Sequence, residues 1–160
     1  MREILFRGKS VNDGEWAHGS LVITTIEPAD DAPIKHYHIE DMTIGVFPNE
    51  HQSGITETVA PSTIGQFTGL TDKNGKKIFE GDIVKVTDSP FGYSYIGVTC
   101  FHEGSFCIQY TYWNKKRFHR IGQTDKWQDM GARGTVTYKY EVVGNIHDNP
   151  ELMGGGGSDG

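Results

Sequence analysis

The sequence is poor in cysteine, has no long hydrophobic run and carries no excess of positive charge. Cys100 and Cys107 are its only cysteines. Two thiols in a chain without a secretion signal more often pack as small apolar groups than form a disulfide, so we expect free thiols. No segment reaches the roughly 20 apolar residues that span a bilayer. The polar start Met1-Arg2-Glu3 lacks the apolar core of a signal peptide, and we expect a cytoplasmic protein.

The net charge of −6 argues against a protein that coats nucleic acid. Nonspecific binding to phosphates depends on an accumulation of Lys and Arg, whereas this chain has 21 acidic and 15 basic side chains. A localised basic patch is compatible with that balance, so contact with phosphate at one site stays open.

The composition is that of a folded chain rich in turns. Hydrophobic residues make up 36% and aromatic residues 11% of the 160 residues, which excludes compositional disorder. The 21 glycines and a mean hydropathy of −0.49 indicate many short strands joined by turns. The glycine-rich end 154–160 has the composition of a flexible linker or an expression remnant and is left out of the functional argument.

Alternating and β-branched segments predict a mainly β fold, a compact barrel or sandwich. Loops are expected at Glu27–Pro33, Pro48–Gly54 and Asp88–Tyr93, and a short helical turn is the only helix expected, near Thr124–Met130. The clearest expected strands are Ile4–Gly8, Trp16–Ile26, Ile83–Val86, Tyr95–Phe101, Phe106–Trp113 and Thr135–Ile146, with a less regular one from Ile34 to Met42.

The middle of the chain reads as turn, short strand, turn, strand. Asp72-Lys73-Asn74-Gly75 is a turn sequence in which Gly75 takes a positive φ without steric cost, and Glu80-Gly81-Asp82 reverses the chain before Ile83. This segment followed by a hairpin looks like half of a small SH3-like barrel. We therefore divide the chain into an N-terminal β lobe, 1–66, and an SH3-like β-barrel half sharing one core, 67–153.

Three blocks of the sequence resemble the YopX family of small proteins from bacteriophages and prophages. They are the segment from Gly65 to Val84, the opening Arg2–Gly8 and the closing Glu141–Leu152. Segments 20–58 and 88–134 lie outside the blocks, and individual specificity is expected there. The resemblance implies a phage or prophage origin and implies no catalytic function.

The histidines His36 and His38 raise the possibility of a metal site. His36 and His38 alternate, so on a strand they share a face. A structural zinc needs two more ligands, and no close pair of cysteines supplies them beside the scattered candidates His102, His119, Cys100 and Cys107. We interpret His36 and His38 as solvated loop residues and expect neither a metal nor a cofactor.

Two groupings raise the question of catalysis. Cys100 with His102 and Glu103 contains a nucleophile, a base and an acid, but nothing around Cys100 resembles a nucleophile elbow. Glu80 and Asp82 form a carboxylate pair, yet Asp82 is better explained by a hydrogen bond to the backbone of its turn. We expect a protein that is not an enzyme.

The strongest binding signal is a run of aromatic residues that leads directly into a cationic cluster. Aromatic faces stack on bases while Arg and Lys pair with phosphate, so the run suits a nucleotide-like ligand. The alternative is a hairpin with Tyr110 and Tyr112 in the core and an exposed basic turn. The candidate residues are Tyr110, Tyr112, Trp113, Lys115, Lys116, Arg117, His119 and Arg120, and Trp127, Lys126 and Arg133 are candidates for the same surface.

Two functions are consistent with these features. The first is a noncatalytic phage accessory protein in the host cytoplasm that binds and sequesters a small anionic or nucleotide-derived molecule, such as a host immune signal, with sites built in a homo-oligomer. The second is a module that binds a host protein or nucleic acid to regulate phage physiology. The acidic balance favours a protein over bulk DNA as the partner of such a module.

Overall fold

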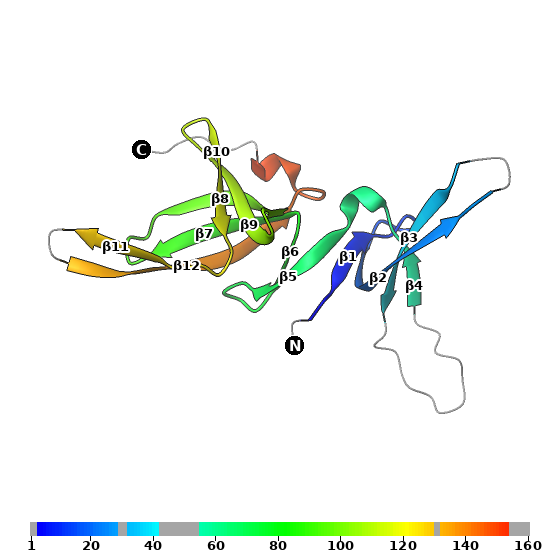
Figure 1. The fold of residues 1–160 in the computed structure, drawn as a ribbon, viewed down its shortest axis with the longest axis horizontal. Helices are drawn as coiled ribbons and strands as arrows, with labels where there is room; N and C mark the ends of the chain where they lie inside the picture. Colours follow the sequence, from blue (N-terminus) through cyan, green and yellow to red (C-terminus); the bar gives the residue numbers. More distant parts are fainter. Residues whose placement is uncertain (1–2, 29–31, 42–54, 130–131, 154–160) are drawn as a thin grey trace, which may run out of the picture. The chain divides into compact units, whose positions relative to one another are not determined.

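A computed structural model describes residues 3–28, 32–41, 55–129 and 132–153. The chain is mostly strand, 66% against 5% helix, in two antiparallel sheets of which one is a curled half-barrel (Figure 1). The predicted mainly β class is confirmed. No helix among these residues has the length and apolar character to cross a membrane. The predicted loop at Pro48–Gly54 lies outside the described residues.

The first sheet has the order β4-β3-β2-β1-β5-β6. Its neighbours from β4 to β5 pair antiparallel, and β2 has the bounds that the sequence predicted. A short 3-10 helix, Pro61–Thr63, precedes β5. The strands of this sheet are β1 Phe6–Lys9, β2 Trp16–Ile26, β3 Ile34–Asp41, β4 Ile55–Thr58, β5 Gly65–Thr71 and β6 Lys77–Phe79.

The second sheet has the order β10-β9-β8-β7-β12-β11. Its long last strand was predicted at Thr135–Ile146 and runs from Ala132 to Asn145, followed by a 3-10 helix at Pro150–Met153. The other strands are β7 Asp82–Ser89, β8 Ser94–His102, β9 Ser105–Tyr112, β10 Lys115–Arg120 and β11 Asp125–Asp129.

The prediction of a helical turn in the second sheet is wrong. The helical turn expected near Thr124–Met130 is strand β11, which pairs with β12 from Asp125↔Val136 to Asp129↔Ala132. Backbone hydrogen bonds to the neighbouring strand override a weak local preference, and they are not visible in an eleven-residue window. The same cause explains β10, where the sequence alone left open an exposed basic turn.

The chain divides into two compact units, Met1–Phe67 and Thr68–Gly160, and the division falls inside β5. In the first unit Ile39 and Val59 are 1% and 2% exposed. The backbone N–H of Lys9 donates to Thr63 Oγ1 at 2.8 Å, which holds β1 against the 3-10 helix. The guanidinium carbon of Arg7 lies 4.5 Å from the ring centroid of Trp16.

The second unit has its core on one side of the second sheet. Ile78, Val84, Val86 and Ile108 are each 0% exposed, and full burial of such a side chain stabilises the fold by about 1.5 to 3 kcal/mol. Pairing places Val86 opposite Tyr95 on β8 and opposite Tyr140 on β12. We call the side of this sheet that carries Val84, Val86, Ile108 and Tyr140 the core face, and the other side the outer face.

The predicted order of turn, strand, turn and strand is confirmed between Asp72 and Ser89. Gly75 has φ +84°, as the turn sequence requires. Asp82 is 1% exposed, and its Oδ2 accepts a hydrogen bond of 2.8 Å from the backbone N–H of Phe79. The predicted role of Asp82 in its own turn is therefore confirmed.

Candidate functional site

The aromatic and basic run forms a hairpin of β9 and β10 joined by Trp113 and Asn114. Both turn residues have positive φ, 51° and 58°, the signature of the tight turn that matches strand twist. Directly paired residues of antiparallel strands point to the same side. Arg117 pairs with Tyr110, and His119 pairs with Ile108. Both pairs therefore belong to the core face.

The hairpin divides the candidate residues between two faces. Because side chains alternate along a strand, the partners of Thr111 and Cys107 point to the outer face; these are Lys116 and Arg120. Trp113 lies in the turn and is 81% exposed. The core face receives Tyr110, Tyr112, Lys115, Arg117 and His119. The run is therefore not one continuous surface.

Tyr95 completes the aromatic surface of the core face. Its ring stacks on Tyr110 with centroids 4.1 Å apart and 28° between the planes. Strands β8 and β9 approach closely here because Gly97 has no side chain: a Cβ on it would lie 2.5 Å from the carbonyl oxygen of Gln109. The Tyr95 hydroxyl is buried without a hydrogen-bond partner among the described residues, and burial raises the pKa of this phenol.

His119 supports this aromatic surface from within. It is 6% exposed, and its ring meets Tyr138 edge to face at 4.1 Å between centroids. Its Nε2 lies 3.1 Å from the Tyr140 hydroxyl and its Nδ1 3.5 Å from Nε2 of Gln123. Since an amide nitrogen donates, Nδ1 accepts and the ring proton sits on Nε2. Burial lowers the pKa of His119, against an opposing effect of Asp125.

Asp125, the first residue of β11, extends the hydrogen bonds around His119 to the edge strand of the sheet. Its Oδ2 accepts a hydrogen bond from the Tyr138 hydroxyl and another, at 3.4 Å, from Nε2 of Gln123. Burial, together with the Asp125 carboxylate, raises the pKa of Tyr138. The bond from Tyr138 holds its ring in place beside His119, which fixes the orientation of these aromatic groups.

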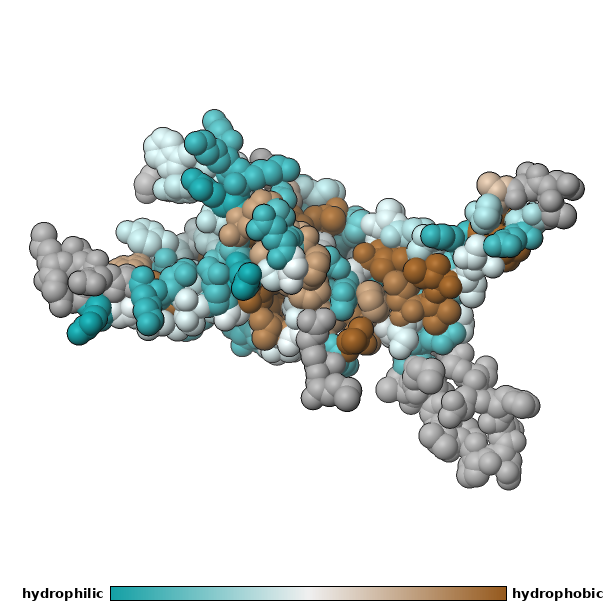
Figure 2. Space-filling model, viewed as in Figure 1, coloured by the Kyte–Doolittle hydropathy of each residue, from teal (hydrophilic) through white to brown (hydrophobic). Residues whose placement is uncertain are grey.

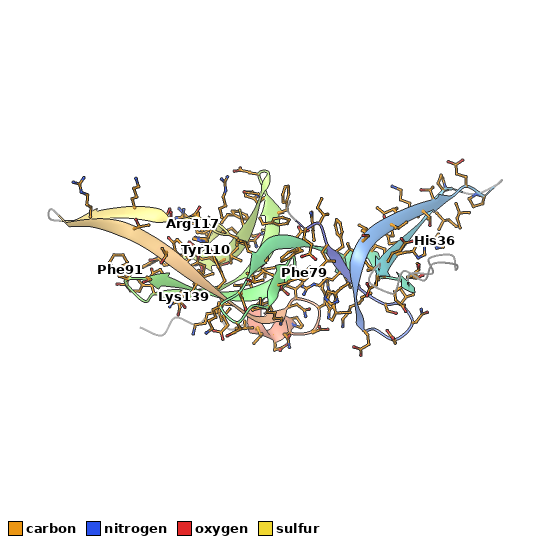
Figure 3. The ribbon with its side chains drawn as sticks, turned by 90° about the horizontal axis from the view of Figure 1, so that it is seen from below. His36, Phe79, Phe91, Tyr110, Arg117 and Lys139 are labelled. Atoms are coloured by element: carbon orange, nitrogen blue, oxygen red, sulfur yellow. The ribbon has the colours of Figure 1, made fainter. Side chains whose placement is uncertain are left out.

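Exposed cations flank the aromatic groups of the core face. Lys115 and Arg117 are exposed, Tyr110 is half-buried, and Figure 3 shows Tyr110 and Arg117 near each other. An aromatic ring with a free guanidinium beside it can hold a planar anion by stacking and by paired hydrogen bonds. Hydrophobic residues also reach the surface in both units (Figure 2), for example Ile23 at 51% and Phe101 at 58% exposure.

The other cationic candidates lie elsewhere. Asp125 pairs with Val136, which lies on the core face, and side chains alternate along each strand. Lys126, which pairs with Thr135, and Arg133, which pairs with Gln128, are therefore on the outer face. The backbone of Trp127 pairs with Gly134. Lys126 and Arg133 thus share a side of the sheet with Lys116 and Arg120, and not with Arg117.

The interpretation of His36 and His38 as loop residues is wrong, because β3 pairs with strands on both sides and takes them into the sheet. Their rings are parallel, with centroids 6.2 Å apart. Nδ1 of His38 lies 3.2 Å from Thr58 Oγ1 and Nε2 lies 3.4 Å from Thr24 Oγ1. Within the described ranges no three His, Cys, Asp or Glu side chains gather as metal ligands would.

Cys100 lies in an environment that opposes ionisation. Burial, Cys107 and Glu80 raise the pKa of its thiol, whereas a nucleophilic cysteine needs a lowered pKa. The ring of His102 stacks on Phe118 at 3.8 Å between centroids, and its Nε2 is 3.8 Å from Glu103 Oε1. Both cysteines are free thiols, as the sequence predicted.

Comparisons with known proteins give one family and one solved structure to report. The family model described as YopX protein matches residues 5–154. A search of curated proteins found no match. The crystal structure of protein EF1440 from Enterococcus faecalis is similar at 22% identity, with 96% of this chain and 99% of that chain covered and a TM-score of 0.36.

Proposed function

This chain belongs to the YopX family, and from that premise we propose that it is a noncatalytic phage accessory protein that binds a small, planar anion of the nucleotide class. The observation that carries the proposal is the direct pairing of Tyr110 with Arg117 on the core face. Stacking and charge pairing require these two groups side by side, and the register of β9 and β10 places them there.

The two contacts supply a gross interaction energy of several kcal/mol, from which the cost of association is subtracted. Stacking of one base on an aromatic side chain contributes about 1 to 3 kcal/mol. A charge-assisted hydrogen bond to a phosphate contributes about 1.5 to 3 kcal/mol, and the guanidinium of Arg117 can make two in parallel. Lys115, two residues away on the same face, adds a second cation. Capture of this kind needs no bond to be made or broken.

The proposed contact residues are fewer than the candidates from the sequence. Tyr110, Tyr112, Lys115 and Arg117 face the ligand, and His119 positions the aromatic rings through its bonds to Tyr140 and Gln123. Lys116 and Arg120 carry the same charge on the outer face. They are natural controls, because their removal changes the net charge without changing the core face.

The test is titration calorimetry with a panel of nucleotides and cyclic nucleotides. Arg117→Ala should weaken binding at least about tenfold, the equivalent of losing one charge-assisted hydrogen bond. Lys116→Ala should leave the dissociation constant within about twofold, since it changes only screened long-range attraction. Equal losses of affinity in both variants would show that net charge, and not a contact with Arg117, determines binding. Absence of binding by every nucleotide would overturn the proposal.

Sequestration in the host cytoplasm, with sites built in a homo-oligomer, is the biological form of this proposal. It is supported by the phage and prophage resemblance of the family and has its own test. Mass spectrometry of the small molecules released when the purified protein is denatured should detect a phosphorylated or cyclic nucleotide. Light scattering of the same sample measures the oligomer, and a monomer would remove the shared-site part of the proposal.

A second candidate function is supported by the tip of the hairpin. Trp113 is 81% and Tyr112 58% exposed, and Trp and Tyr are the side chains that most often anchor protein interfaces. We propose a host-protein interaction module as this alternative. Its signature is a partner retained by the wild type and lost with Trp113→Ala, in a protein that binds no nucleotide.

A further inference from the structure

The only two cysteines of the chain face each other across one hairpin. Cys100 on β8 pairs directly with Cys107 on β9. Direct partners in antiparallel strands project to the same side of the sheet, and here that side is the outer face, opposite the one that holds Ile108. The thiols therefore meet away from the proposed ligand contacts.

The backbone spacing of this pair is compatible with a disulfide. Glu103 and Gly104 form a two-residue turn with φ of 47° and 79°, closed by the pair His102↔Ser105. The closing pair of such a hairpin is hydrogen-bonded, and hydrogen-bonded pairs recur at every second position, so Cys100↔Cys107 is one of them. Such pairs have Cα atoms about 5.5 Å apart, within the common range for disulfides. Closure brings the Cβ atoms together by about 1.5 to 2 Å.

The surroundings allow one thiol to react first. Cys100 is partly exposed, whereas Cys107 is 5% exposed and its sulfur lies 3.7 Å from the Ser105 hydroxyl. Charges that face the pair include Glu80, whose carboxylate opposes ionisation of Cys100, and Arg120, which pairs with Cys107 from β10. An oxidant that reaches Cys100 from solvent leaves Cys107 as the resolving thiol.

We propose that Cys100 and Cys107 are an oxidation site that hydrogen peroxide converts from two thiols to one intrachain disulfide. Because burial, Cys107 and Glu80 raise the pKa of the Cys100 thiol, the reaction is slow at neutral pH and faster at alkaline pH, where more thiolate is present. The Cys100 thiolate attacks one peroxide oxygen, the O–O bond breaks, and with one proton the products are a sulfenic acid and water. The Cys107 sulfur then attacks the Cys100 sulfur, the S–O bond breaks, and the hydroxyl leaves as a second water with the Cys107 proton. Peroxide gains the two electrons that the thiols lose.

The disulfide would tie β8 to β9 without altering the core face. These strands carry Tyr95 and Tyr110, whose stack lies on the other side of the sheet. The oxidised protein should therefore unfold at a temperature several degrees higher, because the cross-link restricts the unfolded chain. The inference does not depend on the proposed nucleotide binding, which a separate titration measures.

The experiment is peroxide treatment of the full chain at alkaline pH, where the Cys100 thiolate is more abundant, then alkylation with N-ethylmaleimide and intact mass spectrometry. The wild type should lose two hydrogen atoms, take up no maleimide, and take up two after reduction with dithiothreitol. Digestion should yield one peptide pair joining Cys100 to Cys107. Cys107→Ala should instead stop at an oxygen adduct on Cys100 or form a linked dimer.

Two results would overturn the proposal. One is a wild type that keeps two alkylatable thiols after peroxide, while its circular dichroism shows an intact β fold. The other is a wild type that accumulates oxygen adducts on the same time course as Cys107→Ala. The matched variant Cys100→Ala should resist oxidation at low peroxide, since its remaining thiol is buried.

Discussion

The turn segment Asp72–Asp82 and the β9–β10 hairpin use polar side chains in opposite ways. In the turn segment the carboxylates of Asp72 and Asp82 are buried and bonded to backbone N–H groups. In the hairpin every side chain of β10 except His119 is exposed. The segment most recognisable in the sequence therefore builds the fold, whereas the hairpin outside it presents mostly exposed side chains.

Asp72 shows how strongly the turn segment depends on one carboxylate. Its Oδ1 accepts from the backbone N–H groups of Asn74 at 2.8 Å and Lys76 at 3.0 Å, and its Oδ2 from Val142 at 3.0 Å. Burial opposes its ionisation, but these three donors and the charge of Lys76 outweigh burial and hold the pKa of Asp72 below its ordinary value. One side chain thus fastens the turn to β12.

The largest expected effect is the loss of that carboxylate. Asp72→Ala should lower the free energy of unfolding by about 3 kcal/mol, because it leaves three N–H groups without their charged acceptor. The measurement is urea denaturation followed by tryptophan fluorescence. Asp88→Ala is the control: its Oδ1 accepts one N–H, from Tyr93, in an exposed turn, so its cost should stay below about 1 kcal/mol. If the two variants lose the same free energy of unfolding, the buried carboxylate of Asp72 is no more important to the fold than an exposed one.

The next prediction concerns pH and the interior of the hairpin. The folded-state pKa of His119 lies below its ordinary value of 6.5, so the unfolded chain binds this proton more readily. The contribution of neutral His119 to stability is fully present above pH 6.5, and it is lost as the pH falls through the lower folded-state pKa. Thermal unfolding across this range should show the loss, and His119→Gln should remove part of the slope. If the variant keeps the same dependence of stability on pH, that dependence comes from other histidines.

A gain in stability is expected at the tip of the hairpin. Trp113 has φ 51°, a left-handed conformation in which a Cβ is unfavourable. Trp113→Gly should raise the free energy of unfolding by about 1 kcal/mol, since glycine adopts this region without strain. Trp113→Ala keeps the Cβ and should show no such gain. If both variants destabilise the fold equally, the exposed indole contributes packing. The tip of the hairpin would then stabilise the fold, as the turn segment Asp72–Asp82 does.

The smallest effect is expected for the Tyr95 phenol, which has no hydrogen-bond partner in the described chain and lies beside Tyr110 of the proposed binding surface. Tyr95→Phe removes a buried hydroxyl without a partner in the described chain and keeps the ring that stacks on Tyr110. Stability should be unchanged or rise by up to about 1 kcal/mol. Tyr95→Leu, which loses the stack, should be less stable than Tyr95→Phe in the same denaturation assay. A loss with Tyr95→Phe would reveal a bound water or ligand at this hydroxyl.

Local signals in the sequence were enough for much of the fold. The turn at Asp72–Gly75, the bounds of β2 and the long β12 follow from turn residues and from side-chain period, which act over a few neighbouring residues. Strand β11 and the strand placement of His36 and His38 did not follow, because the side-chain pattern of these segments is weak and backbone pairing with the adjacent strands β12 and β2 decides their structure. Tyr95 was missed as a member of the site because only the pairing of β8 with β9 places it beside Tyr110.

The mainly β class, the family, several turns and the presence of an aromatic and cationic run follow from the amino-acid sequence alone. The folded chain was needed to show which of those cations share a face with Tyr110, that His119 is buried, and that Cys100 pairs with Cys107. Composition and turn chemistry are local properties of the chain. The sharing of a face is set by strand register, and register depends on pairing between strands and on burial of one face in the core.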